Sequence, residues 1–483
     1  MVEPGTFPDE EAEVDAFIAR LKVGGEPGAS LPWFDPAEPF VVARAPGRLD
    51  VMGGIADYSG SLVLQRPIRE AALAAAQHDP APGLRIVSLA ADGGPARTLA
   101  IDGGTLDRFF NEGCGAARDW FAARPDDHWG SYIAGVVVVL ARDGGAPPGG
   151  GLRVVIDSQV PEAKGVSSSA ALEVAAMSAI AGLLEVPLSG EQTALLCQKA
   201  ENQVVGAACG IMDQMTAAVG RSGSLLALLC QPAEVQGFIR PHESIGFWGI
   251  DSGIRHAVTG GDYTSVRIGA FMGYRILAEL QGLPTAGPNR AGLMWVDDER
   301  WSGRLANVDP AEFVSRFAEL LPRTMRGDAF LAQYGGTTDP ATRVDPSRTY
   351  AVRWPATHAV HEHNRVVRFA ALLAYEPDDD LLGELGEMMA TSHESYSICG
   401  LGSDGTDLLV DLVRAAGSDA GLFGAKITGG GSGGTVAVLG RADAGDEVAR
   451  IARTYEERTG RPAHVFSGSS AGAEAFGVRR VPR

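Results

Sequence analysis

Residues 160–176, VPEAKGVSSSAALEVAA, decide the fold of this chain. Before them, residues 152–156 (LRVVI) alternate and carry β-branched side chains, which predicts a strand. After them, residues 170–184 form a run of Ala, Leu and Met that favours a helix. The segment is therefore expected to join a strand to a helix. Small residues let successive N–H groups converge there, and the helix N-terminus adds unpaired amides and the positive end of its dipole, which predicts an anion-binding loop.

The side chains of this loop suit a phosphate group. The hydroxyls of residues 167–169 can donate to phosphate oxygens or ligate Mg²⁺, and Lys164 places a positive charge at the edge of the loop. The order differs from the Walker pattern, because here the lysine precedes the glycine and three serines follow. By itself, a Gly/Ser-rich turn before a helix can also be no more than a tight turn.

Two further stretches support the phosphate interpretation. They are residues 43–60, ARAPGRLDVMGGIADYSG, and residues 426–436, KITGGGSGGTV. In order and kind, the three stretches resemble the three motifs of the GHMP small-molecule kinases, specifically the galactokinase branch, over nearly the whole chain. The resemblance implies a two-domain α+β fold with the active site in the cleft between the domains. Residues 1–39 would form a lead-in segment, 40–245 the N-terminal domain with the phosphate loop, and 246–483 the C-terminal domain.

Local patterns add several expected elements. Helical spacing predicts a helix over residues 14–22, and residues 40–43 predict a short strand that ends where Pro46 and Gly47 turn the chain. Residues 61–89 predict strands separated by residues 67–70. The region of residues 284–349 is longer than expected for a galactokinase, and the sequence indicates no function for it.

Composition limits the classes of partner. The chain has 483 residues, of which 45% are hydrophobic, so it can form real cores. Its 41 basic and 60 acidic residues give a net charge of −19, which repels nucleic acid and anionic membranes, so a nucleotide must be held by a local cradle. Five cysteines without paired spacing, and no signal-like or membrane-spanning run, predict a reducing, cytoplasmic setting. The sequence leaves the oligomeric state open.

The resemblance places ATP and Mg²⁺ on particular residues. ATP would lie along the loop formed by Lys164, Gly165, Val166, Ser167, Ser168, Ser169 and Ala170. In the family, the third motif closes over the site, which implicates Gly430 and Gly431. Trp129 lies in a segment like the one that flanks the adenine in galactokinases, although a buried aromatic is as easily plain core. Ser169 and Glu201 would hold the metal.

The catalytic residues are expected at Arg48 and Asp213. Asp213 belongs to a CGIMDQ signature at residues 209–214, and it lies twelve positions after Glu201 (213 − 201). On spacing alone, two such acids are usually solvated, and so is a lone arginine in a turn. With the resemblance, Asp213 would take the proton from the attacking anomeric hydroxyl or orient it, and Arg48 would neutralise developing charge.

Sugar recognition is expected from Asp57 and Tyr263. Asp57 follows Arg48 by nine positions (57 − 48), and in the family the matching aspartate accepts sugar hydroxyls. Galactokinases carry a Glu-His pair before the Thr-Asp-Tyr that contains this aspartate, and the glutamate reaches the exocyclic 6-hydroxyl. Here the two positions are Gly54 and Ile55, which removes that polar partner.

Within the galactokinase branch, three stretches most resemble arabinokinases: residues 53–60 (GGIADYSG), 165–169 (GVSSS) and 399–407 (CGLGSDGTD). This resemblance predicts L-arabinose as the monosaccharide. L-Arabinopyranose shares the ring stereochemistry of D-galactopyranose but lacks the hydroxymethyl group. The alternative is a plain galactokinase in which residues 54 and 55 only repack the loop. A non-catalytic sugar sensor of the same family is a third possibility, but such proteins typically carry a damaged phosphate loop, and this loop is intact.

Overall fold

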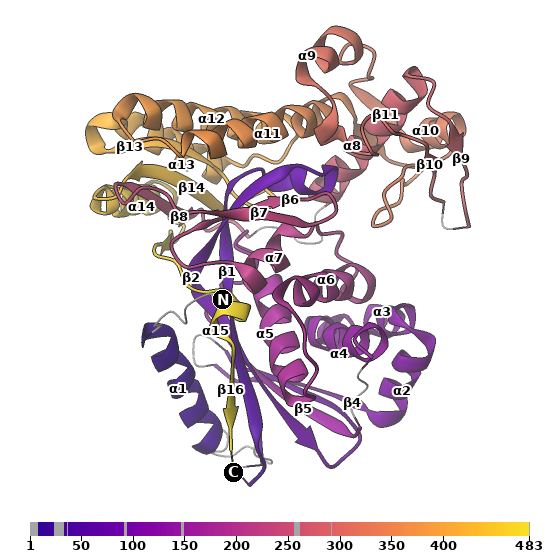
Figure 1. Cartoon of the computed structure of the whole chain (residues 1–483), viewed down its shortest axis with the longest axis vertical. Helices are drawn as coiled ribbons and strands as arrows, with labels where there is room; N and C mark the ends of the chain where they lie inside the picture. Colours follow the sequence, from indigo (N-terminus) through magenta and orange to yellow (C-terminus); the bar gives the residue numbers. More distant parts are fainter. Residues whose placement is uncertain are drawn as a thin grey trace.

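A computed structural model describes residues 8–23, 33–35, 37–90, 94–145, 149–255, 261–290 and 292–482 (Figure 1). Most of the predicted lead-in segment lies outside the described residues. The part that is described contains α1 (Pro8–Val23), which confirms the helix predicted over residues 14–22.

The first sheet has eight strands in the order β16-β1-β2-β5-β3-β4, with β6 beside β2 and β7 beside β6. All of its pairs are antiparallel except β3 with β5. Its strands are β1 (Phe40–Met52), β2 (Leu62–Asp79), β3 (Gly83–Ser88), β4 (Arg97–Asp102), β5 (Gly151–Ser158), β6 (Leu225–Leu229), β7 (Glu234–Ile239) and β16 (Val478–Val481). Because β16 returns from the end of the chain to pair with β1, this sheet contains segments from both predicted domains; the domain limits themselves stay a prediction.

Two sequence expectations about this sheet are wrong. Residues 46–47 do not turn the chain, since β1 runs through them to Met52, and β2 runs through residues 67–70 without a break. Instead, the pairing of the two strands shifts between Pro46 and Arg48. At this bulge the phosphate loop comes so close that a Cβ on Gly47 would lie 2.6 Å from the Val166 carbonyl oxygen. The turn-forming residues therefore serve a close approach of two backbones.

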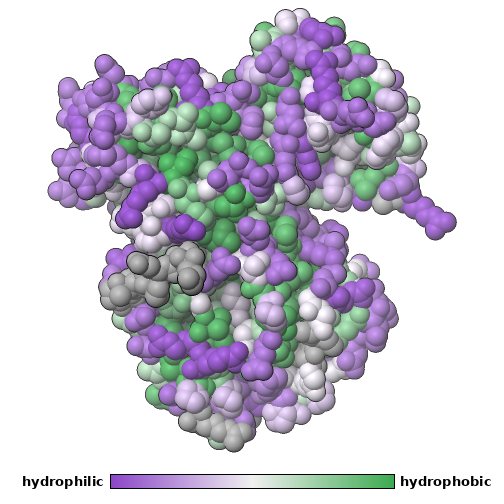
Figure 2. All heavy atoms as spheres, in the orientation of Figure 1, coloured by the Kyte–Doolittle hydropathy of each residue, from purple (hydrophilic) through white to green (hydrophobic). Residues whose placement is uncertain are grey.

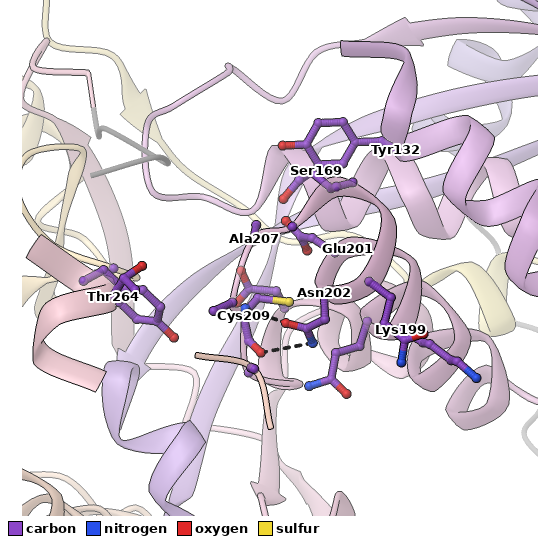
Figure 3. A pocket seen from close by; sticks show the side chains of 18 of the residues that line it. Tyr132, Ser169, Lys199, Glu201, Asn202, Ala207, Cys209 and Thr264 are labelled. Carbon is purple, nitrogen blue, oxygen red and sulfur yellow. Dashed lines mark hydrogen bonds between the residues drawn. The ribbon is translucent and has the colours of Figure 1, made fainter. Parts of the chain in front are cut away.

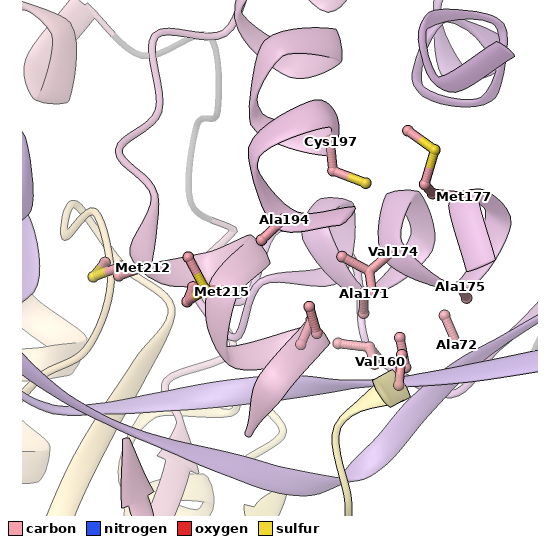
Figure 4. Close-up of a cluster of buried hydrophobic side chains, with 14 of the residues drawn as sticks. Ala72, Val160, Ala171, Val174, Ala175, Met177, Ala194, Cys197, Met212 and Met215 are labelled. Carbon is pink, nitrogen blue, oxygen red and sulfur yellow. The ribbon is translucent and has the colours of Figure 1, made fainter. Parts of the chain in front are cut away.

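Helices cover both faces of the first sheet. On one face lie α2 (Gly103–Glu112), α3 (Cys114–Ala122), α4 (Ser131–Asp143), α5 (Ser168–Leu183), α6 (Gly190–Ala200) and α7 (Met212–Val219). Figure 4 shows how α5, α6 and α7 bury small and apolar side chains together on this face. Alternate residues of β1 and β2 point to the other face, where they pack against α1. The predicted strand and helix around residues 160–176 are confirmed as β5 and α5.

The second sheet has four antiparallel strands in the order β13-β14-β8-β15. They are β8 (Ile245–Asp251), β13 (Leu422–Ile427), β14 (Thr435–Arg441) and β15 (Val465–Phe466). Its helices are α12 (Asp379–Ile398), α13 (Asp404–Ala416) and α14 (Gly445–Thr459), and α13 and α14 bury one apolar face of the sheet. The loop 428–434 joins β13 to β14.

A third group of helices packs around α8 (Gly261–Leu280) and α11 (Arg353–Leu372) with a core of its own. It holds the remaining elements of residues 284–349: β9 (Thr285–Ala286), β10 (Trp295–Val296), η4 (Leu305–Asn307), α9 (Pro310–Glu312), η5 (Phe313–Phe317), β11 (Thr324–Arg326), α10 (Gly327–Tyr334) and, just beyond, β12 (Thr349–Ala351). The short elements η1 (Gly54–Ser59), η2 (Pro125–Gly130), η3 (Glu201–Val205), η6 (Ser418–Ala420) and α15 (Ala473–Phe476) complete the described chain.

The mixed helix-and-sheet architecture predicted from the sequence is confirmed. In the face shown in Figure 2, hydrophilic residues cover most of the outline, and hydrophobic ones gather toward the middle of the view.

Candidate active site

A cavity of about 1140 Å³ lies where the phosphate loop, the start of α7 and the start of α8 meet. Figure 3 shows part of its lining, with Ser169 and Glu201 on one side and Thr264 of α8 facing them from the other. It brings together ten of the residues that the sequence predicts for a site: Arg48, Asp57, Gly165, Ser167, Ser168, Ser169, Glu201, Asp213, Tyr263 and Gly430. They come from elements far apart in the sequence.

The N-terminus of α5 opens onto this cavity. Ser167 precedes the helix in a left-handed conformation with φ of 61°, and its side chain forms no cap on the helix amides. Its hydroxyl is buried without a hydrogen-bond partner among the described residues, while Ser168 and Ser169 are half-buried. Uncapped amides, the unused Ser167 hydroxyl and the positive end of the helix dipole make this end of the cavity suited to an anion.

Arg48 and Asp213 form an ion pair inside the cavity. Arg48 Nη2 lies 2.8 Å from Asp213 Oδ1, and Nε donates to the same oxygen at 3.0 Å. Nη1 donates to the Gly165 carbonyl at 2.7 Å, so the guanidinium also holds the phosphate loop. Asp213 stands in the first turn of α7, where the helix dipole favours a carboxylate. The pair is thereby fixed beside the anion-binding end.

Asp57 lies within η1 and is almost fully buried. Burial, and then the nearby Asp213 carboxylate, raise the pKa of Asp57 to about 7, while Arg267 acts in the opposite direction. Asp57 lies against the backbone of Gly210, where a Cβ would be 1.6 Å from its Oδ2. Tyr263 lines the same cavity, and its ring lies 6.0 Å from that of Tyr58. A buried carboxylate and a phenol here suit the hydroxyls of a small polar ligand.

Glu201 begins η3, directly after α6. Its carboxylate is buried and accepts hydrogen bonds from Ser169 and Cys209 and, at 2.5 Å, from the amide of Gln214. Burial, and then Asp213, raise the pKa of Glu201 to about 7. A cation bound beside Glu201 would stabilise the ionised carboxylate, because its positive charge offsets both the lost hydration and the repulsion by Asp213.

Several other predicted residues do not line the cavity. Lys164 instead forms an ion pair with Asp251 of β8 at 2.7 Å, which ties the phosphate loop to the second sheet. Trp129 packs against the core of the first sheet under Arg97, with 5.5 Å between the guanidinium and the ring centre. Val166 and Ala170 are buried beneath the loop, and Gly431 packs against Leu401.

Gly54 and Ile55 also lie away from the cavity lining, next to Tyr396 of α12. A Cβ on Gly54 would lie 1.6 Å from Tyr396 Oη, so the tyrosine hydroxyl occupies the space of a residue-54 side chain. This hydroxyl accepts from the Ile55 N–H at 2.8 Å and donates to the Gly429 carbonyl at 3.0 Å. Ile55 itself is fully buried in the core around α8 and α11.

Comparison with known proteins identifies the family. The model described as GHMP kinases N terminal domain matches residues 131–221, and GHMP kinases C terminal matches residues 379–457. A galactokinase of Chloroflexus aggregans is 32% identical, over 88% of this chain and 90% of that protein. The chain belongs to the GHMP kinase family.

Another relative of this GHMP kinase is an L-arabinokinase of Arabidopsis thaliana, 42% identical over 93% of the present chain. The alignment covers 47% of the Arabidopsis protein, so the chain spans about half the length of that relative. Among solved structures, a Lactococcus lactis galactokinase complexed with galactose has a TM-score of 0.71 at 19% identity, covering 97% of this chain and all of that one. A mevalonate kinase of Methanococcus jannaschii has a TM-score of 0.52 at 15% identity, over 89% and 98% of the two chains. Both structures confirm the predicted fold.

Membership of this kinase family implies ATP as a substrate. No helix among the described residues is long and apolar enough to cross a membrane.

Sequence reasoning missed several residues of the GHMP kinase site. Residues 340–343, within the stretch to which no task was assigned, line the main cavity. Arg267 of α8 binds Asp339 through two bonds of 2.8 Å and also donates to the Cys209 carbonyl, which holds this stretch beside the site. Glu173 and Gln214 lie behind Glu201, fully buried. The one available signal was a glutamate inside the otherwise apolar run of α5.

Proposed function

We propose that this GHMP kinase is an ATP-dependent sugar 1-kinase, which transfers the γ-phosphoryl group of ATP to the anomeric hydroxyl of a monosaccharide. We propose L-arabinose as the sugar and L-arabinose 1-phosphate as the product. The observation that carries the proposal is the ion pair of Arg48 and Asp213, positioned in one cavity between the amides of α5 and the buried carboxyl of Asp57.

The two ends of the cavity suit two substrates. The α5 amides and the serine hydroxyls face the end where the phosphates of ATP would lie. At the other end, the Asp57 carboxylate would accept hydrogen bonds from the ring hydroxyls of the sugar, and the Tyr263 phenol would donate to them. In this arrangement the reacting hydroxyl would lie next to Asp213.

Asp213 would accept the proton of that hydroxyl or orient it for attack. Its bond to Arg48 keeps the carboxylate in place and offsets negative charge as the phosphoryl group moves. Arg48 also binds the Gly165 carbonyl, so the charge that assists transfer is held against the phosphate loop itself.

Ser169 and Glu201 fit Mg²⁺ as ligands. They offer a hydroxyl and a carboxylate, hard oxygen donors that already hydrogen-bond each other beside the anion-binding end. Within the part of the chain that the structure describes, no three His, Cys, Asp or Glu side chains gather as a metal site. Mg²⁺ in kinases is commonly held by one or two protein oxygens together with substrate phosphates and water, and it neutralises charge on the phosphates.

Two observations support L-arabinose over D-galactose. The Arabidopsis relative named L-arabinokinase is 42% identical over nearly the whole chain. Gly54 stands at the position where galactokinases carry the glutamate that serves the 6-hydroxyl, so that polar partner is absent here.

The test is an assay of ADP release with L-arabinose, D-galactose and a panel of other free sugars. Phosphorus NMR of the product then establishes whether the phosphate is on the anomeric carbon. If none of the sugars in the panel causes ADP release, the result would contradict a sugar kinase and favour the non-catalytic sensor. A preference for D-galactose would favour galactokinase, the second candidate that the Chloroflexus relative supports.

A further inference from the structure

Glu173 is a buried acid that the proposed reaction leaves unused. It lies on α5, six residues after Ser167 (173 − 167), and none of its surface is exposed. The hydrogen bond that reaches its carboxyl within the described chain comes from the Gln214 amide, with 3.3 Å from Nε2 to Oε2. The other oxygen, Oε1, is buried and has no hydrogen-bond partner among the described residues.

Gln214 of α7 contacts two acids at once. Its Nε2 lies 2.5 Å from Glu201 Oε2 and 3.3 Å from Glu173 Oε2, and the whole residue is buried. An amide nitrogen has two hydrogens, so one can go to each carboxyl group. The three side chains therefore form a chain from α5 through α7 to the residue that we assign to the metal.

Glu173 is a poor choice for stability alone. Burial, and then the neighbouring Glu201, hold the pKa of the Glu173 carboxyl well above its usual range. A buried carboxyl with one unbonded oxygen costs free energy that an apolar residue of similar volume would not. The residues one turn away on the same face of α5 include Ala170, Ala176 and Met177, all buried, so this face accepts apolar packing. The polar group is therefore explained by its contact with Gln214.

We propose that Glu173 is a positioning residue for the magnesium site and acts through the Gln214 amide on Glu201. By accepting one amide hydrogen, Glu173 prevents the Gln214 amide from rotating. The second hydrogen then stays directed at Glu201, whose carboxylate is kept facing Ser169. Residues that hydrogen-bond a metal ligand directly, as Gln214 bonds Glu201, commonly change metal affinity by about 10- to 100-fold.

The test measures metal binding directly and rests on the proposed kinase function only for the choice of ligand. Free Mn²⁺ is titrated by electron paramagnetic resonance against enzyme saturated with a non-hydrolysable ATP analogue. Glu173→Met, one contact further from the metal than Gln214, should weaken Mn²⁺ binding by about tenfold, the lower end of that range. Glu173→Gln, whose side-chain carbonyl can still accept from Gln214, should bind within about threefold of wild type. Met177→Leu, at a buried position one turn further along α5, should bind as wild type does.

Thermal unfolding separates positioning from a merely structural role. Loss of a structural contact would lower the melting temperature of Glu173→Met, whereas removal of an under-bonded polar group should leave it unchanged or raise it. Gln214→Met should weaken Mn²⁺ binding with Glu173 intact, and the double variant should be no weaker than the worse single variant. Normal Mn²⁺ affinity in either single Met variant, or equal loss in Glu173→Gln, would overturn the proposal.

These outcomes are distinguishable from failure of the proposed function. The sugar panel on the wild-type enzyme tests the reaction, and the Mn²⁺ titration needs no turnover.

Discussion

The Arg48 guanidinium and the Asp213 carboxylate meet at 2.8 Å although 165 residues separate them along the chain. Arg48 follows a bulge in β1, and Asp213 stands in the first turn of α7. The guanidinium is 3% exposed and the carboxylate 23%, so the arginine is enclosed while the aspartate remains open to a substrate. The pair is thus built as a fixed cation with an accessible base or orienting group.

This relationship predicts the effect of Asp213→Ala. Turnover should fall by about 10²- to 10⁴-fold, because a positioned acid-base group typically contributes that much. Sugar binding, measured by calorimetry, should persist, since Asp57 and Tyr263 are unchanged. Turnover within a few-fold of wild type would remove Asp213 from the reaction.

Glu201→Gln should raise the Mg²⁺ concentration needed for half-maximal activity. The amide keeps the size of the side chain but removes the charge that attracts a hard cation. The exposed Glu191→Gln, on the preceding helix α6, is the matched control and should leave the titration unchanged. If Glu201→Gln requires the same Mg²⁺ concentration as the wild-type enzyme and the Glu191→Gln control, Glu201 has only a structural role.

The sugar preference should appear in kcat/KM. L-Arabinose should exceed D-galactose by roughly ten- to hundredfold, because an unsatisfied buried hydroxyl costs about 1–3 kcal/mol. A pentose with one ring hydroxyl inverted is the control for recognition by Asp57 and Tyr263, and it should be poor for that reason. Equal values for the first two sugars would contradict the arabinose assignment.

Asp57 predicts a pH dependence of stability. Its pKa is raised from 3.8 to about 7, so between these values the folded protein keeps a proton that the unfolded chain releases. The Asp57 contribution therefore destabilises the ligand-free protein increasingly as pH rises from about 4 to 7, with the full penalty above 7. The Asn side chain of Asp57→Asn does not titrate in this range. The unfolding free energy of the variant minus that of wild type should therefore increase by about 1–4 kcal/mol between pH 5 and 8.

Chemical denaturation at several pH values measures this difference. The exposed Asp126→Asn should show no pH-dependent gain. A difference between Asp57→Asn and wild type that does not change with pH would contradict the raised pKa.

Tyr396→Phe tests the link between the sugar loop and the third motif. Without Oη, the buried Ile55 N–H loses its partner, which should cost about 1–3 kcal/mol of unfolding free energy. Denaturant titration measures the loss, and Tyr375→Phe, at an exposed site, is the control. A loss no larger than in the control would show that water replaces the hydroxyl.

Much of the fold was predictable because its signals are local. The strand, the glycine and serine turn and the apolar helix around residues 160–176 follow from residue spacing, and they became β5, the phosphate loop and α5. The motif positions of Arg48, Asp57, Glu201 and Asp213 were also predictable, and the structure gathers all four around one cavity. Their roles stay proposals.

The bulge at Gly47 was not predictable from its own segment. Pro46 and Gly47 are typical of a turn, yet here the glycine admits the Val166 carbonyl from the phosphate loop. The partner that decides the conformation lies more than a hundred residues away, so no local pattern contains it.

By itself, the sequence determined the family and the strand–loop–helix unit around residues 160–176, and it supplied the candidate residues for phosphoryl transfer, because these depend on residue type and short spacing. Tertiary structure alone decided which charges are free and which are paired. It turned Lys164 from a candidate phosphate ligand to the partner of Asp251, and it buried Lys426 against Asp50, 376 residues away, at 2.6 Å. It also placed Glu173 behind Glu201. Burial and ion pairing arise only when distant segments pack, and burial is the main cause that raises the pKa of Asp57 and of Glu201.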